Sequence, residues 1–224
     1  MTTAARSLTE VHARPPSLPP LESGDRLTSA EFERRYRLHP EIRRAELIEG
    51  VVRVASPMHH TAHGAPQRVV STWLGLYQSQ NPDVDGGDGS TTRLDAENNV
   101  QPDSFLRYRT GTSRVTEDDY IAGAPELAFE VAASSAAVDL GPKMRAYRRN
   151  GVQEYVVWQL YENRLSWFSL EDGEYVELQP DGRGVISSKV FPGLRLAVQK
   201  LLDRDIAGVL AEQNRRARKA RRAR

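Results

Sequence analysis

The sequence predicts an α/β or α+β fold, in which a mixed β-sheet is flanked by helices. Segments with helical and strand periodicity follow one another as helix, hairpin, helix, strands, helix and strands. Hydrophobic residues at 39% and charged residues at 27% are typical of a globular protein with a core. The chain has no cysteine, which excludes disulfides, thiolate nucleophiles and cysteine-ligated zinc and agrees with a cytoplasmic location.

Charge and composition divide the 224 residues into a leader, one domain and a tail. We expect a flexible proline-rich leader at 1–25, a folded domain at 26–205 and a basic helical tail at 206–224. Residues 215–224 hold seven of the 31 basic side chains and no acidic one, so the remainder has 24 basic and 30 acidic groups. This mildly acidic body does not bind nucleic acid through its net charge alone. No apolar run reaches the roughly 20 residues of a membrane span, so we expect no membrane association.

The first half of the chain predicts two helices around a hairpin. Thr28 and Glu31 have capping-box spacing before a short helix that ends at Pro40. Residues 45–55 read as a hairpin, and a histidine-rich loop at 56–66 leads into the second helix. That helix has apolar residues at i, i+3, i+4 and i+7 spacing: Val69, Val70, Trp73, Leu76 and Tyr77. Four large aromatic residues are expected in the core or on a dimer surface rather than against bases: Trp73, Tyr77, Trp158 and Trp167.

The second half predicts mainly strands. Strands are expected at 89–94, 100–107, 127–132, 154–160, 164–170 and 174–178, with an edge segment at 191–194. Residues 110–124 suggest a charged loop containing a short helix. Helices are expected at 141–150, where Asn150-Gly151 is a typical stop, and at 199–224.

Two carboxylates and a lysine predict the chemistry. Asp103 and Glu130 each stand in a short apolar segment. Lys143 lies on the helix that is expected next along the chain. Glu130 stands in a segment that otherwise reads as buried, where a charge needs a partner or a metal. Mg²⁺ prefers oxygen ligands, activates water and neutralises charge during phosphodiester hydrolysis. The alternative is that Asp103 caps a strand, Glu130 lies at an edge and Lys143 is a solvated helix residue.

Several motifs carry a resemblance to a known family. They are Glu46-Leu47-Ile48-Glu49-Gly50, His63-Gly64, Gln101-Pro102-Asp103, Gly123 to Val131, Asp139-Leu140 to Lys143 and Tyr147, and Gly151 to Tyr155. In order and spacing, over about residues 26–205, they resemble the Uma2 (DUF820) family of restriction-endonuclease-like proteins in the PD-(D/E)XK nuclease superfamily. The resemblance implies a restriction-endonuclease-like mixed sheet flanked by helices, Mg²⁺ or possible Mn²⁺, a DNA substrate, a homodimer and no organic cofactor.

The resemblance also assigns residues, with one departure from the superfamily pattern. Asp103 is similar to the Asp of "PD" and Glu130 to the second acid, but Ala132 stands where the lysine belongs. Lys143 then resembles a migrated substitute. Glu46 is a candidate third acid. The equally supported alternative is that Glu46 is an exposed strand residue.

Two further side chains are candidates for the same site. His63 is a candidate contact to a phosphate or a metal-bound water, against an ordinary surface histidine, and Tyr147 is placed one helical turn from Lys143 to brace it. Two rival functions remain open for the chain: a non-catalytic nucleic-acid- or protein-binding module with the nuclease fold, and a structural dimer.

Overall fold

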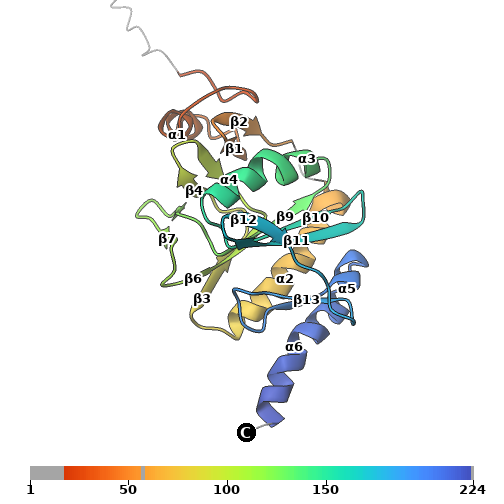
Figure 1. Cartoon of the computed structure of the whole chain (residues 1–224). Coiled ribbons are helices and arrows are strands. Elements are labelled where there is room, and N and C mark those ends of the chain that lie inside the picture. Colours follow the sequence, from red (N-terminus) through yellow and green to blue (C-terminus); the bar gives the residue numbers. More distant parts are fainter. Residues whose placement is uncertain (1–17, 57–58, 223–224) are drawn as a thin grey trace, which may run out of the picture.

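The computed structural model describes residues 18–56 and 59–222. The strands of this part form two six-stranded sheets and one two-stranded sheet, with helices against them (Figure 1). The predicted α+β architecture with a mixed sheet is therefore confirmed. Residues 1–17 of the leader predicted at 1–25 lie outside the described residues, and Leu21 in its remaining part is buried.

The central sheet carries most of the fold. Its order is β12-β11-β10-β9-β6-β3, and every pairing is antiparallel except the parallel pair β9–β10. The strands are β3 (Val84–Gly87), β6 (Ser104–Tyr108), β9 (Leu127–Ala132), β10 (Glu154–Gln159), β11 (Arg164–Glu171) and β12 (Glu174–Glu177). The β9 and β10 side chains are buried along their whole length, as expected for central strands covered on both faces.

The second sheet lies beside the central sheet and has the order β2-β1-β5-β4-β8-β7. Its strands are β1 (Ala45–Ile48), β2 (Val51–Val54), β4 (Thr92–Asp95), β5 (Asn98–Val100), β7 (Arg114–Val115) and β8 (Ile121–Ala122). The predicted hairpin is the β1–β2 pair, and its turn places Glu49 and Gly50 at positive φ. The third sheet pairs β13 (Val185–Ser187) with β14 (Arg195–Ala197).

Two strand predictions and one helix prediction were wrong in detail. The strand expected at 100–107 is broken, because the chain leaves one sheet after Val100 and enters the other at Ser104. Pro102 lies in the break, where its missing N–H cannot continue a ladder. The short helix expected within 110–124 is replaced by β7 and β8. The edge segment expected at 191–194 is the connection between β13 and β14.

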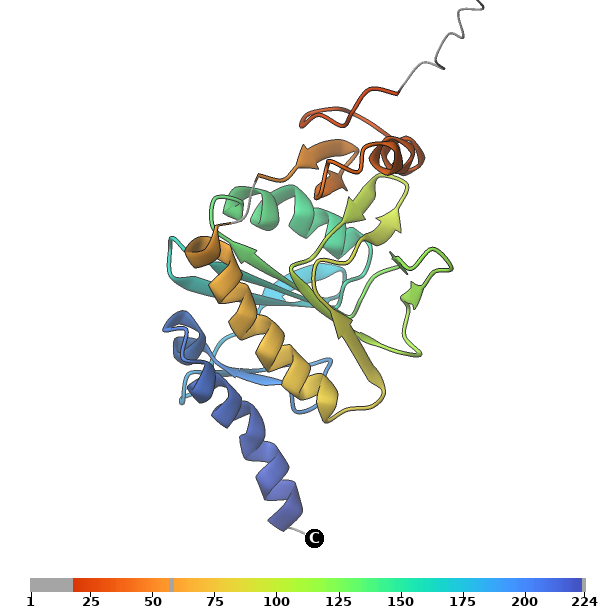
Figure 2. The ribbon, with the colours of Figure 1, turned by 180° about the vertical axis from the view of Figure 1, so that it is seen from behind.

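Helices cover the two faces of the central sheet, and one packs on the second sheet. They are α1 (Ser29–Leu38), the π-helical turn η1 (His60–Gly64), α2 (Ala65–Ser79), α3 (Ala136–Val138), the π-helical turn η2 (Asp139–Lys143), α4 (Met144–Arg149), α5 (Val198–Leu202) and α6 (Ile206–Arg222). The Thr28 side chain caps α1 by accepting from the Glu31 amide. Figures 1 and 2 show α4 and α2 on opposite sides of the sheet.

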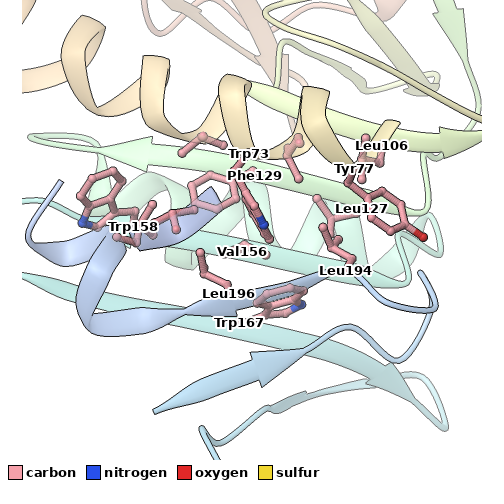
Figure 3. Close-up of a cluster of buried hydrophobic side chains, with 14 of the residues drawn as sticks. Trp73, Tyr77, Leu106, Leu127, Phe129, Val156, Trp158, Trp167, Leu194 and Leu196 are labelled. Atoms are coloured by element: carbon pink, nitrogen blue, oxygen red, sulfur yellow. The ribbon is translucent and has the colours of Figure 1, made fainter. Parts of the chain in front are cut away.

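The main hydrophobic core lies between α2 and the central sheet (Figure 3). Trp73 on α2 packs edge-on against Phe129 on β9 and Trp167 on β11, with ring centroids 6.4 and 5.9 Å apart. Trp73, Tyr77, Trp158 and Trp167 are all buried here, which confirms their prediction as core residues.

The C-terminal helix begins as part of this core. The chain turns between α5 and α6 at Arg204, whose φ is +57°, so the single helix expected at 199–224 is two. Val209 is buried, and the Gln213 side chain accepts hydrogen bonds from Trp73 Nε1 and the Arg195 amide. Side chains beyond Arg215, where most of the basic tail lies, are outside the described part. No helix among the described residues is both long and apolar enough to cross a membrane.

Candidate active site

The register of β6 and β9 brings the two predicted acids together. Ser104 pairs with Phe129, so continuing the antiparallel register by one residue sets Asp103 opposite Glu130, with both side chains on one face. Asp103 Oδ2 accepts a hydrogen bond of 2.8 Å from the Val131 amide. The Asp103 carboxylate thus accepts the Val131 N–H at the point where the ladder between β6 and β9 ends. Asp103 therefore lies directly before β6, beside Glu130 on the neighbouring strand β9.

Lys143 reaches the same place from the segment after β9. Its Nζ lies 2.8 Å from Glu130 Oε1 and 2.8 Å from Glu46 Oε1, and the side chain is 2% exposed. Gly141, with φ −111° and ψ −107°, breaks the helical path just before Lys143. Ala132 is buried on the Glu130 face of β9, and its small side chain occupies little of that space. Lys143 from η2 therefore lies beside Glu130, on the same face of β9 as Ala132.

Glu46 belongs to this cluster rather than to the exposed surface. Its Oε1 binds Lys143 and also accepts a 2.6 Å hydrogen bond from the Gln101 amide. The β1 strand that carries Glu46 pairs with β5, and the chain continues from β5 into Asp103. The second sheet thus delivers a third carboxylate to the end of the central sheet.

Asp103 has two basic neighbours. Its Oδ1 accepts from Arg44 Nη2 at 2.9 Å and lies 3.2 Å from His63 Nε2. Arg44 Nη2 also donates to the Gln101 carbonyl, which fixes the guanidinium to the same loop as Asp103. The η1 turn before α2 positions His63, whereas His59 and His60 are exposed. Arg44 belongs to no motif, so no sequence pattern indicated its contact with Asp103.

Tyr147 has a different partner from the one predicted. Its hydroxyl donates to Glu130 Oε1 at 3.0 Å, so it braces the acid rather than Lys143. The ring packs on Tyr155 with centroids 4.9 Å apart, and the Tyr155 hydroxyl donates to the Asp139 carbonyl. These tyrosines link α4 and β10 to the carboxylates, and helical spacing alone did not reveal that connection.

Burial and charge shift the pKa values of the two central acids in opposite directions. Burial opposes ionisation of Asp103, but the hydrogen bond with His63 and the positive charge of Arg44 lower its pKa to about 2. Burial raises the pKa of Glu130 well above its usual value, and Asp103 adds to that rise. Burial also opposes the charge of Lys143, yet Glu130 and Glu46 hold its pKa above the ordinary value. Lys143 is therefore an ammonium at neutral pH.

The cluster has more carboxylates than cations. Asp139 at the start of η2 is a fourth acid that sequence reasoning had not assigned to the site; it is buried, which raises its pKa. Two permanently charged groups face these acids, namely Arg44 and Lys143. A surplus of buried negative charge is relieved either by protons or by a bound cation.

This donor set fits a hydrated divalent cation. Asp103 and Glu130 offer carboxylate oxygens, the ligand type that Mg²⁺ prefers. No three His, Asp or Glu side chains of the described residues converge to form a complete metal cage. Mg²⁺ is commonly held by one or two carboxylates and keeps several waters, so this limited set suits it better than a fully coordinated zinc site would.

The cluster forms the floor of a cavity of about 490 Å³. The cavity is lined by Glu46, Asp103, Glu130 and Lys143, and also by residues of the β1–β2 hairpin and of the turn after β10. Asp103 and Glu130 are 3% and 2% exposed, so a reacting group must enter the cavity to reach them.

The protein thus has a mixed sheet flanked by helices, with Asp103 next to the start of β6, Glu130 on β9 and Lys143 between two carboxylates. The chain belongs to the Uma2 family, described as "Putative restriction endonuclease", whose pattern matches residues 29–199. The fold is similar to that of a "putative nuclease belonging to DUF820" from Anabaena variabilis ATCC 29413, with TM-score 0.57 and 16% identity over 71% of this chain and 90% of that one. A comparison with curated proteins found no match.

Proposed function

We propose that this protein is a metal-dependent endonuclease that hydrolyses phosphodiester bonds in DNA. The observation that carries the proposal is the position of Lys143 Nζ, 2.8 Å from Glu130 and from Glu46, in the same cavity as Asp103. The family description and the nuclease named above support a nucleic-acid substrate. We further propose a cytoplasmic homodimer in which each protomer addresses one strand.

Each residue of the cluster has a distinct role in this proposal. Asp103 and Glu130 would hold Mg²⁺, or Mn²⁺ in its place, and a bound ion would supply an activated water and neutralise phosphate charge. Lys143, as an ammonium, stabilises negative charge that develops on the phosphate and is not the base. Glu46 holds the lysine in position.

The groups around Asp103 orient it or meet the substrate. Arg44 keeps the Asp103 carboxylate ionised and aligned through its hydrogen bond to Oδ1. His63 Nε2 reaches the same oxygen and lines the cavity, so it is placed to contact a phosphate that enters. Tyr147 fixes the orientation of Glu130 from the opposite side.

Cleavage of supercoiled plasmid with Mg²⁺ or Mn²⁺ tests the proposal. We expect metal-dependent nicking by the wild type and a loss of at least about 100-fold in Asp103→Asn and in Lys143→Ala, because the first weakens a metal ligand and the second removes a positive charge beside the reacting phosphate. Leu38→Ala, at an exposed site outside the cavity lining, is the matched control and keeps full activity. Nicking that survives Asp103→Asn would place the activity at another site or in a contaminant.

A non-catalytic binding module is the second candidate. Two observations favour it: Ala132 replaces the usual lysine, and the ammonium of Lys143 is already paired with two carboxylates. Calorimetric binding of Mg²⁺ without cleavage of plasmid, linear duplex, single-stranded DNA or RNA would select this candidate over the endonuclease.

A further inference from the structure

The turn after β10 exposes an aromatic side chain at the mouth of the cavity. Among the described residues, four large hydrophobic side chains are strongly exposed: Leu38, Val115, Tyr161 and Val176. Tyr161, at 71% exposure, is the member of this set that lines the cavity. Exposing an aromatic ring to water forfeits the stabilisation that its burial would give. Packing within the fold therefore does not explain why an aromatic residue stands at position 161.

An exposed cation lines the same cavity from the other sheet. Arg53 on β2 pairs in register with Glu46 on β1, so the two side chains lie on one face of the hairpin. Arg53 is exposed, and within the described ranges it makes no ion pair or side-chain hydrogen bond. Its guanidinium is therefore available to a phosphate, which planar guanidinium groups bind in bidentate fashion.

The depth of the site limits what kind of nucleic acid reaches it. A cavity of about 490 Å³ has the size of a small-ligand pocket, and both central acids are buried at its floor. A phosphodiester held in a regular duplex stays at the surface of a paired helix, whereas an unpaired segment can extend into such a pocket. Unpaired bases also leave their faces free to stack on an aromatic side chain.

We propose that Tyr161 and Arg53 bind a single-stranded segment of nucleic acid at the cavity mouth, with a base stacked on Tyr161 and a phosphate paired with Arg53. This inference rests on the proposed function and narrows its substrate to unpaired strands, ends or distorted duplexes. Stacking matters here because the body of the chain is mildly acidic, with 24 basic and 30 acidic groups outside residues 215–224, and attracts phosphates weakly.

Binding without metal tests this inference separately from catalysis. Fluorescence anisotropy in EDTA would compare oligo-dT and oligo-rU of about 12 nucleotides with a blunt hairpin duplex, a length within the usual range for single-strand sites. We expect both single strands to bind more tightly than the duplex. Tyr161→Ala should weaken single-strand binding about tenfold, whereas Tyr161→Phe should retain it, because stacking needs the ring and not the hydroxyl.

Arg53 is tested by the salt dependence of the same binding. Arg53→Gln should reduce the slope of log affinity against log salt by about 0.7, the value for one phosphate contact on a single strand. Leu38→Ala and Arg114→Gln are the matched controls, since both residues are exposed and lie outside the cavity lining. Both controls should bind as the wild type does.

The outcomes separate this inference from the endonuclease proposal. Duplex binding equal to or tighter than single-strand binding, or an unchanged affinity in Tyr161→Ala, would overturn the inference even if plasmid nicking persists. Single-strand binding that depends on Tyr161 and Arg53, without cleavage of any substrate, would support the inference and reject the endonuclease. Tighter binding of rU than dT, with both lost in Tyr161→Ala, would identify RNA as the favoured strand.

Discussion

The two faces of β9 show how one strand serves both the core and the site. Leu127, Phe129 and Val131 point toward α2 and enter the aromatic core. Ala128, Glu130 and Ala132 point toward α4, where the two alanines flank a single carboxylate. On the first face large side chains fill the space, and on the second small ones leave room for Lys143 and Tyr147 to reach Glu130. The side chains of β9 alternate between two faces, so the residues of the core lie on one face and those of the candidate site on the other.

The largest expected effect is on the core face. Phe129→Ala should lower the free energy of unfolding by about 4 kcal/mol, because it leaves a cavity beneath Trp73. Its neighbour on the other face, Glu130→Gln, should change stability by only about 1 kcal/mol while abolishing metal-dependent nicking. Urea denaturation of both variants measures the difference. Equal destabilisation by the two substitutions would contradict the division between the faces.

A smaller effect is expected from removing the cation on the site face. Lys143→Met should destabilise the protein by about 3 kcal/mol at neutral pH, because Glu130 and Glu46 lose their partner. Mg²⁺ should raise the melting temperature of this variant more than that of the wild type, since a bound cation offsets the same charges. Arg164→Met, which breaks an exposed pair with Glu177, is the matched control and should cost at most about 1 kcal/mol. A Mg²⁺ response equal to that of the wild type would count against a shared cation position.

The smallest effect is a pH dependence with opposite signs at the two acids. The folded-state pKa of Glu130 is raised above 4.5, so the stability linked to its proton is present below that pH and is lost as pH rises through the folded-state pKa. Asp103 has a lowered pKa of about 2, so its contribution is present above 3.8 and is lost as pH falls toward 2.

Glu130→Gln isolates the first of these two contributions. Its free energy of unfolding, relative to that of the wild type, should increase by about 1 kcal/mol in total between about pH 5 and pH 8, with a slope below the limit of about 1.4 kcal/mol per pH unit for one proton. Urea denaturation across this range measures the difference. Asp103→Asn, whose lost contribution changes at more acidic pH, should show no such rise over the same interval.

Local pattern was enough to predict the elements that hold the two acids and the lysine. The apolar run at 127–132, the carboxylate inside it and the helix around Lys143 each depend on neighbouring residues, so the sequence indicated them. Helix periodicity likewise predicted the burial of Trp73 and Tyr77 on α2. These features follow from spacing along a single segment.

What the sequence did not indicate depends on distant pairings. The break at Gln101–Asp103 follows from β5 pairing with β1 in one sheet while β6 pairs with β9 in the other. Arg44 contacts Asp103 across 59 positions of the chain. Tyr147 binds Glu130, which lies 17 positions away on β9. Each of these contacts requires the sheet register, which no local motif specifies.

Asp103 has two separate structural roles, one for each oxygen of its carboxylate. One oxygen completes the end of a β-ladder, and the other faces Arg44 and His63. An asparagine at this position retains an acceptor for the amide but loses the negative charge, so we expect the change to spare folding and to weaken the proposed cation binding. In related proteins without cleavage activity, we therefore expect asparagine rather than an apolar residue at the position of Asp103.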